Sequence, residues 1–183
     1  MNKILLIITG SIAASRCREI ITLLNNIEVN ISCILTKEAK KYVKISDIKK
    51  LLKNRIFTDE DEKKNKMLHI NLSRDNDIIV VCPATANSIA KLANGYGDNL
   101  SSNTLLASNK NILFVPAMNS FMWHNKINQK NVRLLKDSGH EFIGPKVGKL
   151  KCGEFGEGRI EDTKNIINFL ISKFKKNTQF INK

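Results

Sequence analysis

The chain has 183 residues, of which 42% are hydrophobic and 26% charged, and its formal net charge at pH 7 is +13. These values are those of one ordinary globular domain with an apolar core, and they exclude a small domain held together by disulfides or metal ions. The apolar runs at residues 4–8 and 78–82 are too short to cross a bilayer, and no leader-like segment precedes the first expected strand. We therefore expect a cytoplasmic protein without a membrane partner.

The positive charge is spread along the chain. Lysines gather only in short runs, at residues 49–50, 63–64 and 173–176, and no basic strand carries interleaved aromatic residues. Proteins that bind nucleic acids concentrate lysines and arginines on one face, because clustered cations neutralise neighbouring phosphates. The charge pattern favours a solvated surface, and we expect no nucleic-acid partner.

The four cysteines are Cys17, Cys33, Cys82 and Cys152, and they contain no CxxC pair. The sequence therefore indicates neither a disulfide framework nor a metal site. Cys17, Cys33 and Cys82 are expected to pack as small hydrophobic side chains. Cys152 differs, because the glycines around it predict an exposed thiol on a mobile loop.

The first half of the chain alternates strands with helices. Apolar runs predict strands at residues 1–9 and 29–35, and helical spacing predicts helices at residues 12–24, 37–43 and 46–54. Gly10 and Ser11 predict a tight turn, and Thr36 is the expected N-cap of the second helix. Residues 58–65 are expected to form a highly charged loop.

The same alternation continues in the second half. Strands are predicted at residues 78–81, 111–115 and 141–143, and helices at residues 86–93, 128–138 and 162–174. Residues 94–103 predict a long functional loop or a helix interrupted by turns, residues 146–159 a glycine-rich flap, and residues 175–183 a frayed basic tail. The order predicts one α/β domain at residues 1–174, with a doubly wound, Rossmann-like or flavodoxin-like parallel sheet between two layers of helices.

Three segments follow strand ends at the same edge of this expected sheet, namely Gly10-Ser11, residues 83–87 and residues 116–123. Each places small or hydroxyl residues where a helix begins, and the N–H groups and dipole of a helix N-terminus suit a phosphate. Residues 116–123 add Asn119, Met122 and Trp123, although Met122 and Trp123 could equally be core residues. Three such segments together point to a phosphate-bearing ligand at this edge.

Several segments in order and spacing resemble one known family. They are Gly10-Ser11-Ile12-Ala13-Ala14, Leu35-Thr36-Lys37-Glu38-Ala39, His69 within residues 68–72, residues 83–87, Gly95-Tyr96-Gly97-Asp98-Asn99-Leu100 and residues 116–123. Over nearly the whole chain these segments resemble the homo-oligomeric flavin-containing cysteine decarboxylases. Residues 151–159, around Cys152, resemble the substrate flap of the members that act on 4'-phosphopantothenoylcysteine in coenzyme A synthesis.

The resemblance implies a set of site residues. FMN would contact Gly10, Ser11, Ile12 and Thr36 at its phosphate end, and Thr85, Ala86, Asn87, Ser88 and Ala117 at its ring. The substrate would contact Asn119, which would hold its carboxylate, and Met122, Leu150, Lys151, Gly153 and Arg159. His69 would act as base or orienter and Cys152 as a late proton donor. Thr85 and Lys151 depart from the family pattern, which usually has Ser and Ala there, and Lys151 could alter the fit of the flap.

The implied activity is FMN-dependent decarboxylation of 4'-phosphopantothenoylcysteine to 4'-phosphopantetheine and CO₂. Direct loss of CO₂ from an acylated cysteine has no electron sink, whereas oxidation of the CH₂–SH carbon by flavin to a thioaldehyde supplies one, and re-reduction then restores the balance. The excess positive charge suits a phosphorylated substrate. The resemblance further implies a homo-oligomer, either a trimer or a dodecamer of four trimers, and leaves open whether the chain stands alone or belongs to a fusion with a synthetase domain.

Other interpretations of the same residues remain open. A lone histidine in apolar surroundings, such as His69, is more often structural, and Cys152 alone could be an ordinary loop thiol. The chain could be a decarboxylase of peptide carboxy-terminal cysteines, against which the Cys152 flap argues. It could also be a non-enzymatic flavin-binding regulatory module, against which the joint presence of His69, Asn119 and Cys152 argues.

Overall fold

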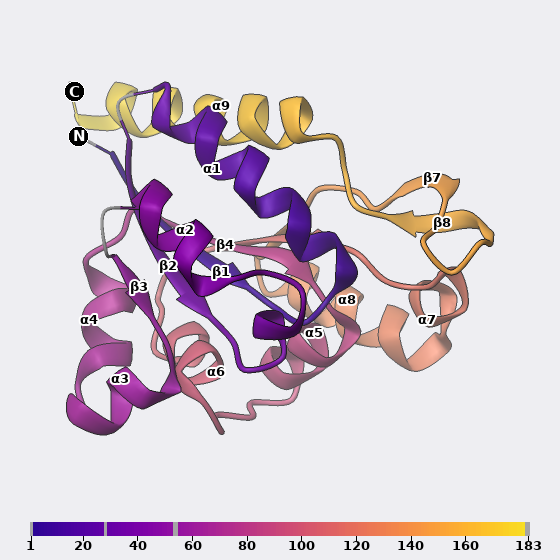
Figure 1. Cartoon of the computed structure of the whole chain (residues 1–183), viewed down its shortest axis with the longest axis horizontal. Coiled ribbons are helices and arrows are strands. Elements are labelled where there is room, and N and C mark those ends of the chain that lie inside the picture. Colours follow the sequence, from indigo (N-terminus) through magenta and orange to yellow (C-terminus); the bar gives the residue numbers. More distant parts are fainter. Residues whose placement is uncertain (1, 28, 53–54, 182–183) are drawn as a thin grey trace.

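The computed structural model describes residues 2–27, 29–52 and 55–181 (Figure 1). In this part of the chain a six-stranded sheet has the order β3-β2-β1-β4-β5-β6, and every neighbouring pair of strands is parallel. The strands are β1 (Asn2–Ile8), β2 (Val29–Leu35), β3 (Ile56–Phe57), β4 (Ile78–Ala84), β5 (Ile112–Pro116) and β6 (Glu141–Phe142). The doubly wound parallel sheet expected from the sequence is confirmed.

Helices cover both faces of the sheet. One face packs against α1 (Cys17–Asn25), α2 (Ile45–Leu52) and α9 (Thr163–Ile181), and the other against α4 (Leu68–Arg74), α5 (Ala86–Ala93), α6 (Leu100–Leu106) and α8 (Lys126–Asp137). Strand β1 shows why both faces are filled, because Ile4, Leu6 and Ile8 belong to one core cluster and Leu5 and Ile7 to the other. Successive side chains of a strand point to opposite faces, so a continuous apolar run suits a sheet that is covered twice.

The prediction of a charged loop at residues 58–65 is wrong, because this segment contains helix α3 (Asp59–Lys64). Thr58 and Asp61 form a capping box in which Thr58 N donates to Asp61 Oδ2 over 2.8 Å. Acidic residues in the first turn and lysines in the last also complement the helix dipole. The charges therefore stabilise a helix here rather than a solvated loop.

Other boundaries differ by a turn or more. The expected helix at 12–24 divides into a 3₁₀ segment, η1 (Ile12–Arg16), and α1, while the helix expected at 37–43 shortens to η2 (Ala39–Lys41). The interrupted segment 94–103 leads into α6 at Leu100, and a short helix, α7 (Ser120–His124), follows β5. Two expected boundaries lie outside the described residues. They are the start of the first strand at residue 1 and the end of the third helix at residue 54.

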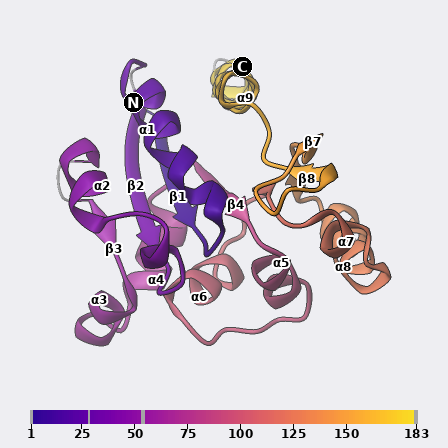
Figure 2. The same cartoon turned by 45° about the vertical axis from the view of Figure 1, so that its right-hand side comes forward.

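The glycine-rich flap is an antiparallel hairpin, formed by β7 (Lys146–Lys149) and β8 (Phe155–Arg159). Figure 2 shows the hairpin projecting beyond the end of the sheet, beside α7. Helix α9 continues to Ile181, past the expected end at residue 174, and the fraying of the tail stays a prediction. Among the helices described, none has the length and apolarity that crossing a bilayer requires, and the cytoplasmic location also stays a prediction.

Candidate active site

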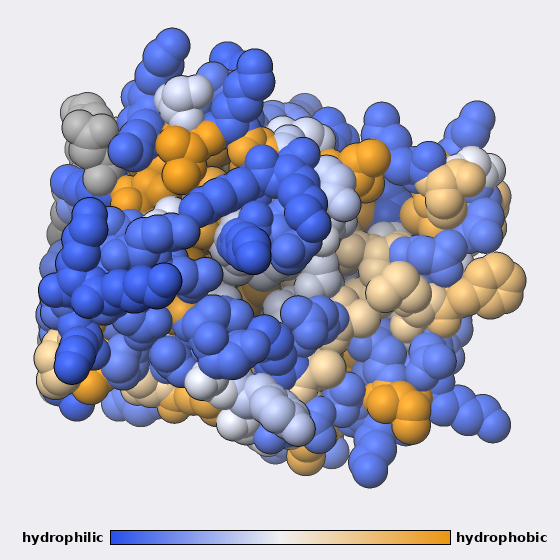
Figure 3. All heavy atoms as spheres, turned by 60° about the horizontal axis from the view of Figure 1, so that its bottom comes forward, coloured by the Kyte–Doolittle hydropathy of each residue, from blue (hydrophilic) through white to orange (hydrophobic). Residues whose placement is uncertain are grey.

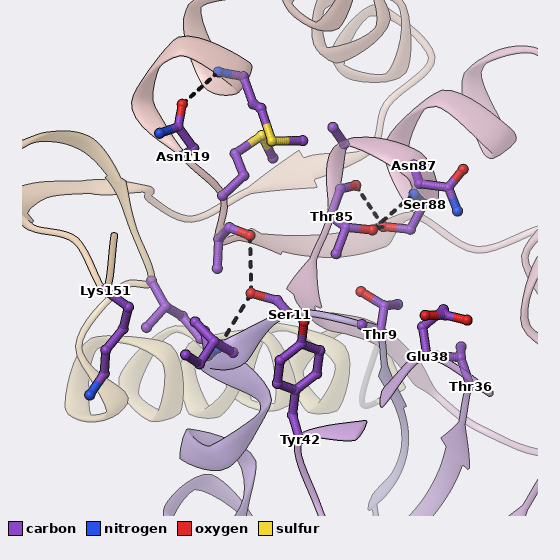
Figure 4. A pocket seen from close by; sticks show the side chains of 18 of the residues that line it. Thr9, Ser11, Thr36, Glu38, Tyr42, Thr85, Asn87, Ser88, Asn119 and Lys151 are labelled. Carbon is purple, nitrogen blue, oxygen red and sulfur yellow. Dashed lines mark hydrogen bonds between the residues drawn. The ribbon is translucent and has the colours of Figure 1, made fainter. Parts of the chain in front are cut away.

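The carboxyl ends of β1, β4 and β5 open onto one pocket of about 1140 Å³ (Figure 4). Its lining contains every site residue expected from the sequence except His69, namely Gly10, Ser11, Ile12, Thr36, Thr85, Ala86, Asn87, Ser88, Ala117, Asn119, Met122, Leu150, Lys151, Cys152, Gly153 and Arg159. The expected convergence of three strand ends is therefore confirmed, because β1, β4 and β5 are neighbours in the sheet. The roles of these residues toward a ligand stay predictions.

Hydrogen bonds tie the three strand ends to one another. Thr9 Oγ1 donates to the carbonyl of Pro83 over 2.6 Å, and Ala117 N donates to the carbonyl of Ala84 over 3.1 Å. Ser11 Oγ donates to the carbonyl of Ala117 over 3.3 Å. These bonds join the loop after β1 to those after β4 and β5, so the pocket floor has a defined shape without a ligand.

The turn after β1 depends on Gly10. A Cβ placed on Gly10 would lie 2.4 Å from Cβ of Glu38, so only glycine allows this approach of the two loops. Beside it, Ser11 caps η1. Thr36 Oγ1 accepts a hydrogen bond from Ala39 N over 3.3 Å, but the N-cap of η2 is Glu38, so the prediction of Thr36 as the N-cap is wrong because the helix begins two residues later than expected. Bare backbone and two hydroxyl groups therefore meet at one corner of the pocket.

The loop after β4 begins α5 with a hydroxyl cap. Thr85 Oγ1 accepts from Ser88 N over 3.2 Å, and Ser88 Oγ donates to the carbonyl of Thr85 over 2.8 Å. Threonine thus performs the capping that a serine at this position could perform, and the departure of Thr85 from the family pattern does not remove the cap. The start of α5, with small Ala86 beside it, faces the pocket.

Asn119 presents its two side-chain ends to different partners. Its Oδ1 accepts hydrogen bonds from the backbone N–H groups of Phe121 (2.8 Å) and Met122 (3.3 Å), which caps α7. Its Nδ2 is thereby turned to the hairpin, where it donates to Glu154 Oε2 and lies 3.8 Å from Cys152 Sγ. Asn119 therefore offers a donor group to whatever lies between β5 and the hairpin tip.

The hairpin rests on the loop after β5 through two glycines. Met118 N donates to the carbonyl of Gly158 over 3.0 Å, and a Cβ on Gly158 would lie 2.3 Å from Met118 O. A Cβ on Gly156 would lie 2.6 Å from Ser120 Oγ. This close backbone contact brings the hairpin tip, with Cys152, over the mouth of the pocket.

Basic side chains surround the hairpin side of the pocket. Arg159 lies 3.7 Å from Asp162, and Lys146 hydrogen bonds to the same carboxylate, which holds the pKa of Asp162 below its ordinary value. Within the described residues no ion pair involves Lys149 or Lys151, both of which line the pocket. The pocket mouth therefore carries cations that are available to an anionic ligand.

The four thiols divide as the sequence analysis expects. Cys17, Cys33 and Cys82 are buried in the core, and Cys152 is exposed. The pKa of Cys17 is raised first by its hydrogen bond with Cys82 and then by burial, and burial alone raises the pKa of Cys33. The buried thiols are therefore packing groups, and Cys152 is the thiol that a ligand could reach.

His69 does not line this pocket. It lies on α4, at the opposite end of the molecule from the hairpin (Figure 1). Its Nδ1 is 2.8 Å from Glu62 Oε1, in an orientation that makes no hydrogen bond. One chain does not bring His69 and Cys152 together, so a shared site would need a second copy of the chain.

The structure adds two residues, one beside the pocket and one in its lining, that the sequence analysis did not single out. Glu154, on the hairpin tip, contacts Asn119, and its position two residues after Cys152 could have indicated it. Asp59 lines the pocket, and its Oδ1 accepts a hydrogen bond over 3.0 Å from Leu100 N, at the start of α6. Asp59 carried no local signal, since its partner lies 41 residues along the chain.

The fold and pocket define a class of protein. A doubly wound sheet whose ligand pocket lies at the carboxyl ends of neighbouring strands, beside capped helix starts, is typical of nucleotide- and flavin-binding proteins. The family model described as Flavoprotein matches residues 1–175. The chain belongs to the Flavoprotein family, as the sequence resemblance implied.

Curated relatives share the whole domain. A protein of Streptococcus mutans named "Probable phosphopantothenoylcysteine decarboxylase" is 34% identical over 170 residues, which are 91% of this chain and 95% of that protein. The "Coenzyme A biosynthesis bifunctional protein CoaBC" of Bacillus subtilis is 33% identical over 179 residues, which are 97% of this chain and 44% of that protein. The chain therefore spans less than half the length of this bifunctional relative.

Solved structures have the same fold. A mutant of PPC decarboxylase complexed with pantothenoylaminoethenethiol matches with a TM-score of 0.86 and 28% identity, over 95% of this chain and 98% of that one. The peptidyl-cysteine decarboxylase EpiD matches with a TM-score of 0.80 and 29% identity, over 93% of this chain and 99% of that one. The similarity extends over nearly the full length of both chains.

Gly158 should tolerate a methyl group less well than the neighbouring Gly153. Both have a positive φ, but a Cβ on Gly158 meets Met118 O, whereas one on Gly153 meets nothing within 4 Å. We expect Gly158→Ala to lower the free energy of unfolding by about 1–3 kcal/mol more than Gly153→Ala does. Urea denaturation of the two variants measures the difference. Trypsin should also cut faster at Lys149 and Lys151 in Gly158→Ala. Equal stability and equal cleavage in the two variants would contradict the contact.

Proposed function

We propose that this chain binds FMN in the pocket and decarboxylates 4'-phosphopantothenoylcysteine to 4'-phosphopantetheine in coenzyme A biosynthesis. The observation that carries the proposal is the approach of Cys152 Sγ to within 3.8 Å of Asn119 Nδ2 at the pocket mouth. The relatives named as phosphopantothenoylcysteine decarboxylase support it. Because the chain spans part of the bifunctional relative, the proposal concerns the decarboxylation alone.

The residues present fit a phosphorylated flavin. The volume of about 1140 Å³ slightly exceeds the range of about 300–1,000 Å³ that is usual for small-molecule sites, which leaves room for a cofactor and a substrate together. Gly10, Ser11 and Thr36 would hold the phosphate where bare backbone and hydroxyl groups meet, and the small side chains of Ala86 and Ala117 would leave space for the ring. When bound, FMN would supply oxidation of the thiol-bearing carbon and the later return of hydride.

The chain's own groups would then position the substrate and move its protons. Asn119 Nδ2 would bind the substrate carboxylate, because its Oδ1 is already engaged by α7 and the amide can present only its donor. Once CO₂ has left, the thiol of Cys152 would donate a proton to the carbon that had carried the carboxylate. Lys149 and Lys151 would attract the phosphate of the substrate to the pocket mouth.

We further propose a homo-oligomer, a trimer or a dodecamer of four trimers, in which His69 of the partner subunit completes the site. Large apolar side chains are exposed on this chain, including Phe121 (79% exposed), Ile127 (68%) and Tyr96 (64%). Figure 3 shows apolar side chains gathering over the end of the molecule that carries α7 and the hairpin. An apolar area of this kind is typical of a surface covered by another chain.

Decarboxylation of the carboxy-terminal cysteine of a peptide is the second candidate, favoured by the match to EpiD. The lysines at the pocket mouth favour a small phosphorylated substrate instead. Competition between 4'-phosphopantothenoylcysteine and a peptide that ends in cysteine separates the two, since the preferred substrate should dominate CO₂ release.

Purified protein should release FMN on denaturation. The cofactor is measured by its absorption spectrum and mass after heat precipitation of the protein. Gly10→Ala should lower the FMN content several-fold, because its Cβ would press on Glu38 and deform the phosphate corner, while Gly95→Ala, which meets no atom within 4 Å, should keep it. Release of FAD, of a nicotinamide nucleotide or of no cofactor would contradict the assignment.

His69→Asn and Cys152→Ser should fail at different steps. Without its base or orienter, His69→Asn should leave the substrate unchanged, with turnover reduced about 10²–10⁴-fold. Cys152→Ser should still release CO₂ but accumulate a species with two hydrogens fewer than the product, because a hydroxyl is a far weaker acid than a thiol. Mass spectrometry of a single-turnover mixture distinguishes the two, with His124→Asn as the histidine control. Full turnover by Cys152→Ser would make Cys152 an ordinary loop thiol.

Two measurements should detect the oligomer, namely its size in solution and the activity regained when two inactive variants are combined. Light scattering should give at least a trimer at working concentration. Co-refolding inactive His69→Asn with inactive Cys152→Ser should restore part of the activity, because some sites would combine an intact His69 from one copy with an intact Cys152 from another. A monomer with full activity would overturn the shared site.

A further inference from the structure

Glu154 contacts both Asn119, the group proposed to bind the substrate carboxylate, and Cys152, the proposed late proton donor, and the proposed function leaves it without a role. Its Oε2 accepts the hydrogen bond from Asn119 Nδ2, and Cys152 Sγ donates to the same oxygen over 3.5 Å. The carboxylate lies on the hairpin tip, whereas Asn119 lies on the loop after β5. One carboxylate therefore connects the tip to the amide group of the pocket.

The tip that carries Glu154 has bonds of its own. Leu150 N donates to the carbonyl of Glu154 over 2.7 Å, and Gly153 N donates to the carbonyl of Leu150 over 3.0 Å. These bonds hold Cys152 and Glu154 in a fixed relation, because both lie inside the small loop that the bonds close. Any movement of the Glu154 carboxylate toward or away from Asn119 would therefore displace the Cys152 thiol as well.

Asn119 can serve one carboxylate well, and not two. Its Oδ1 accepts hydrogen bonds from the N–H groups that begin α7, which leaves only Nδ2 to bind a carboxylate. Although Nδ2 carries two N–H bonds, two carboxylates on one nitrogen would lie within about 5 Å of each other and repel. The carboxylate of Glu154 and a carboxylate of the substrate would therefore compete for the same amide.

We propose that Glu154 is a positioning residue that holds the place of the substrate's carboxylate on Asn119 until the substrate displaces it. The inference rests on the proposed function, because it requires a substrate whose carboxylate binds Asn119. When that carboxylate leaves as CO₂, Nδ2 loses its anion and Glu154 returns to it. The return carries Cys152 back beside Asn119, at the stage when its proton is needed.

The binding test uses two ligands that differ only in the carboxylate. They are 4'-phosphopantothenoylalanine, which has no thiol and cannot be oxidised, and the matching N-ethylamide, which lacks the carboxylate. Calorimetry on the FMN-loaded protein should show that Glu154→Ala binds the alanine compound about three- to tenfold more tightly, the value of one hydrogen bond to a competing group. Binding of the ethylamide should change less than about twofold.

Glu157 supplies the matched control. It is a carboxylate on the same hairpin, but it pairs with His124 Nε2 at 3.4 Å instead of Asn119. Glu157→Ala removes the same charge, so a general electrostatic effect on an anionic ligand would appear in both variants. Glu154→Asp should bring the ratio of the affinities for the alanine compound and the ethylamide back toward that of the parent protein, because it restores a carboxylate at the same position.

Turnover gives a second readout that a purely structural role would not produce. Glu154→Ala should lower KM, because the internal competitor is gone, and lower kcat, because Cys152 is no longer drawn back after CO₂ leaves. The species with two hydrogens fewer than the product should then accumulate before it is reduced. Glu157→Ala should change neither constant by more than about twofold.

Three outcomes would overturn the inference. The two ligands could gain equally in Glu154→Ala, Glu157→Ala could show the same selective gain, or KM and kcat could fail to fall together. If the parent protein binds neither ligand and releases no CO₂, the proposed function itself is wrong and this inference falls with it. A parent protein that binds and decarboxylates, without selectivity in Glu154→Ala, overturns the role of Glu154 alone.

Discussion

The common direction of β1, β4 and β5 is the constraint on which the pocket depends. Parallel neighbours end at the same edge, so the loops that follow Ile8, Ala84 and Pro116 meet there without any long excursion of the chain. Bonds such as that from Thr9 to Pro83 then join these loops directly. The apolar strands beneath are buried on both faces, which gives the loops a rigid base.

Much of the pocket's polarity is already engaged in local structure. The hydroxyl groups of Ser11 and Thr85 and the amide oxygen of Asn119 all cap the short helices that follow the strands. A cap holds its side chain in one orientation, and it thereby decides which group is left to face a ligand. For Asn119 the remaining group is Nδ2, so capping and ligand recognition are two consequences of the same hydrogen bonds.

The hairpin and α4 occupy opposite ends of the molecule, and this separation shapes the proposed site (Figure 1). Glycines at 156 and 158 let β8 approach the loop after β5 closely enough to bring Cys152 over the pocket. His69 stays with Glu62 on the far side. If the two residues act at one site, as proposed above, several copies of the chain must combine them, and the exposure of Phe121 agrees with such an assembly.

The strands, most helices and the pocket residues near them follow from local patterns, because an apolar run or a capping pair acts within a few residues. Even α3, which the sequence analysis took for a loop, has a local cause in the Thr58–Asp61 capping box. The sequence by itself therefore determined the doubly wound sheet and the convergence at its edge. Only the tertiary structure decided that Glu154 meets Asn119, 35 residues away, and that His69 lies apart from Cys152. Such contacts depend on the placement of the hairpin and of α4 against the sheet, which no short stretch of residues encodes.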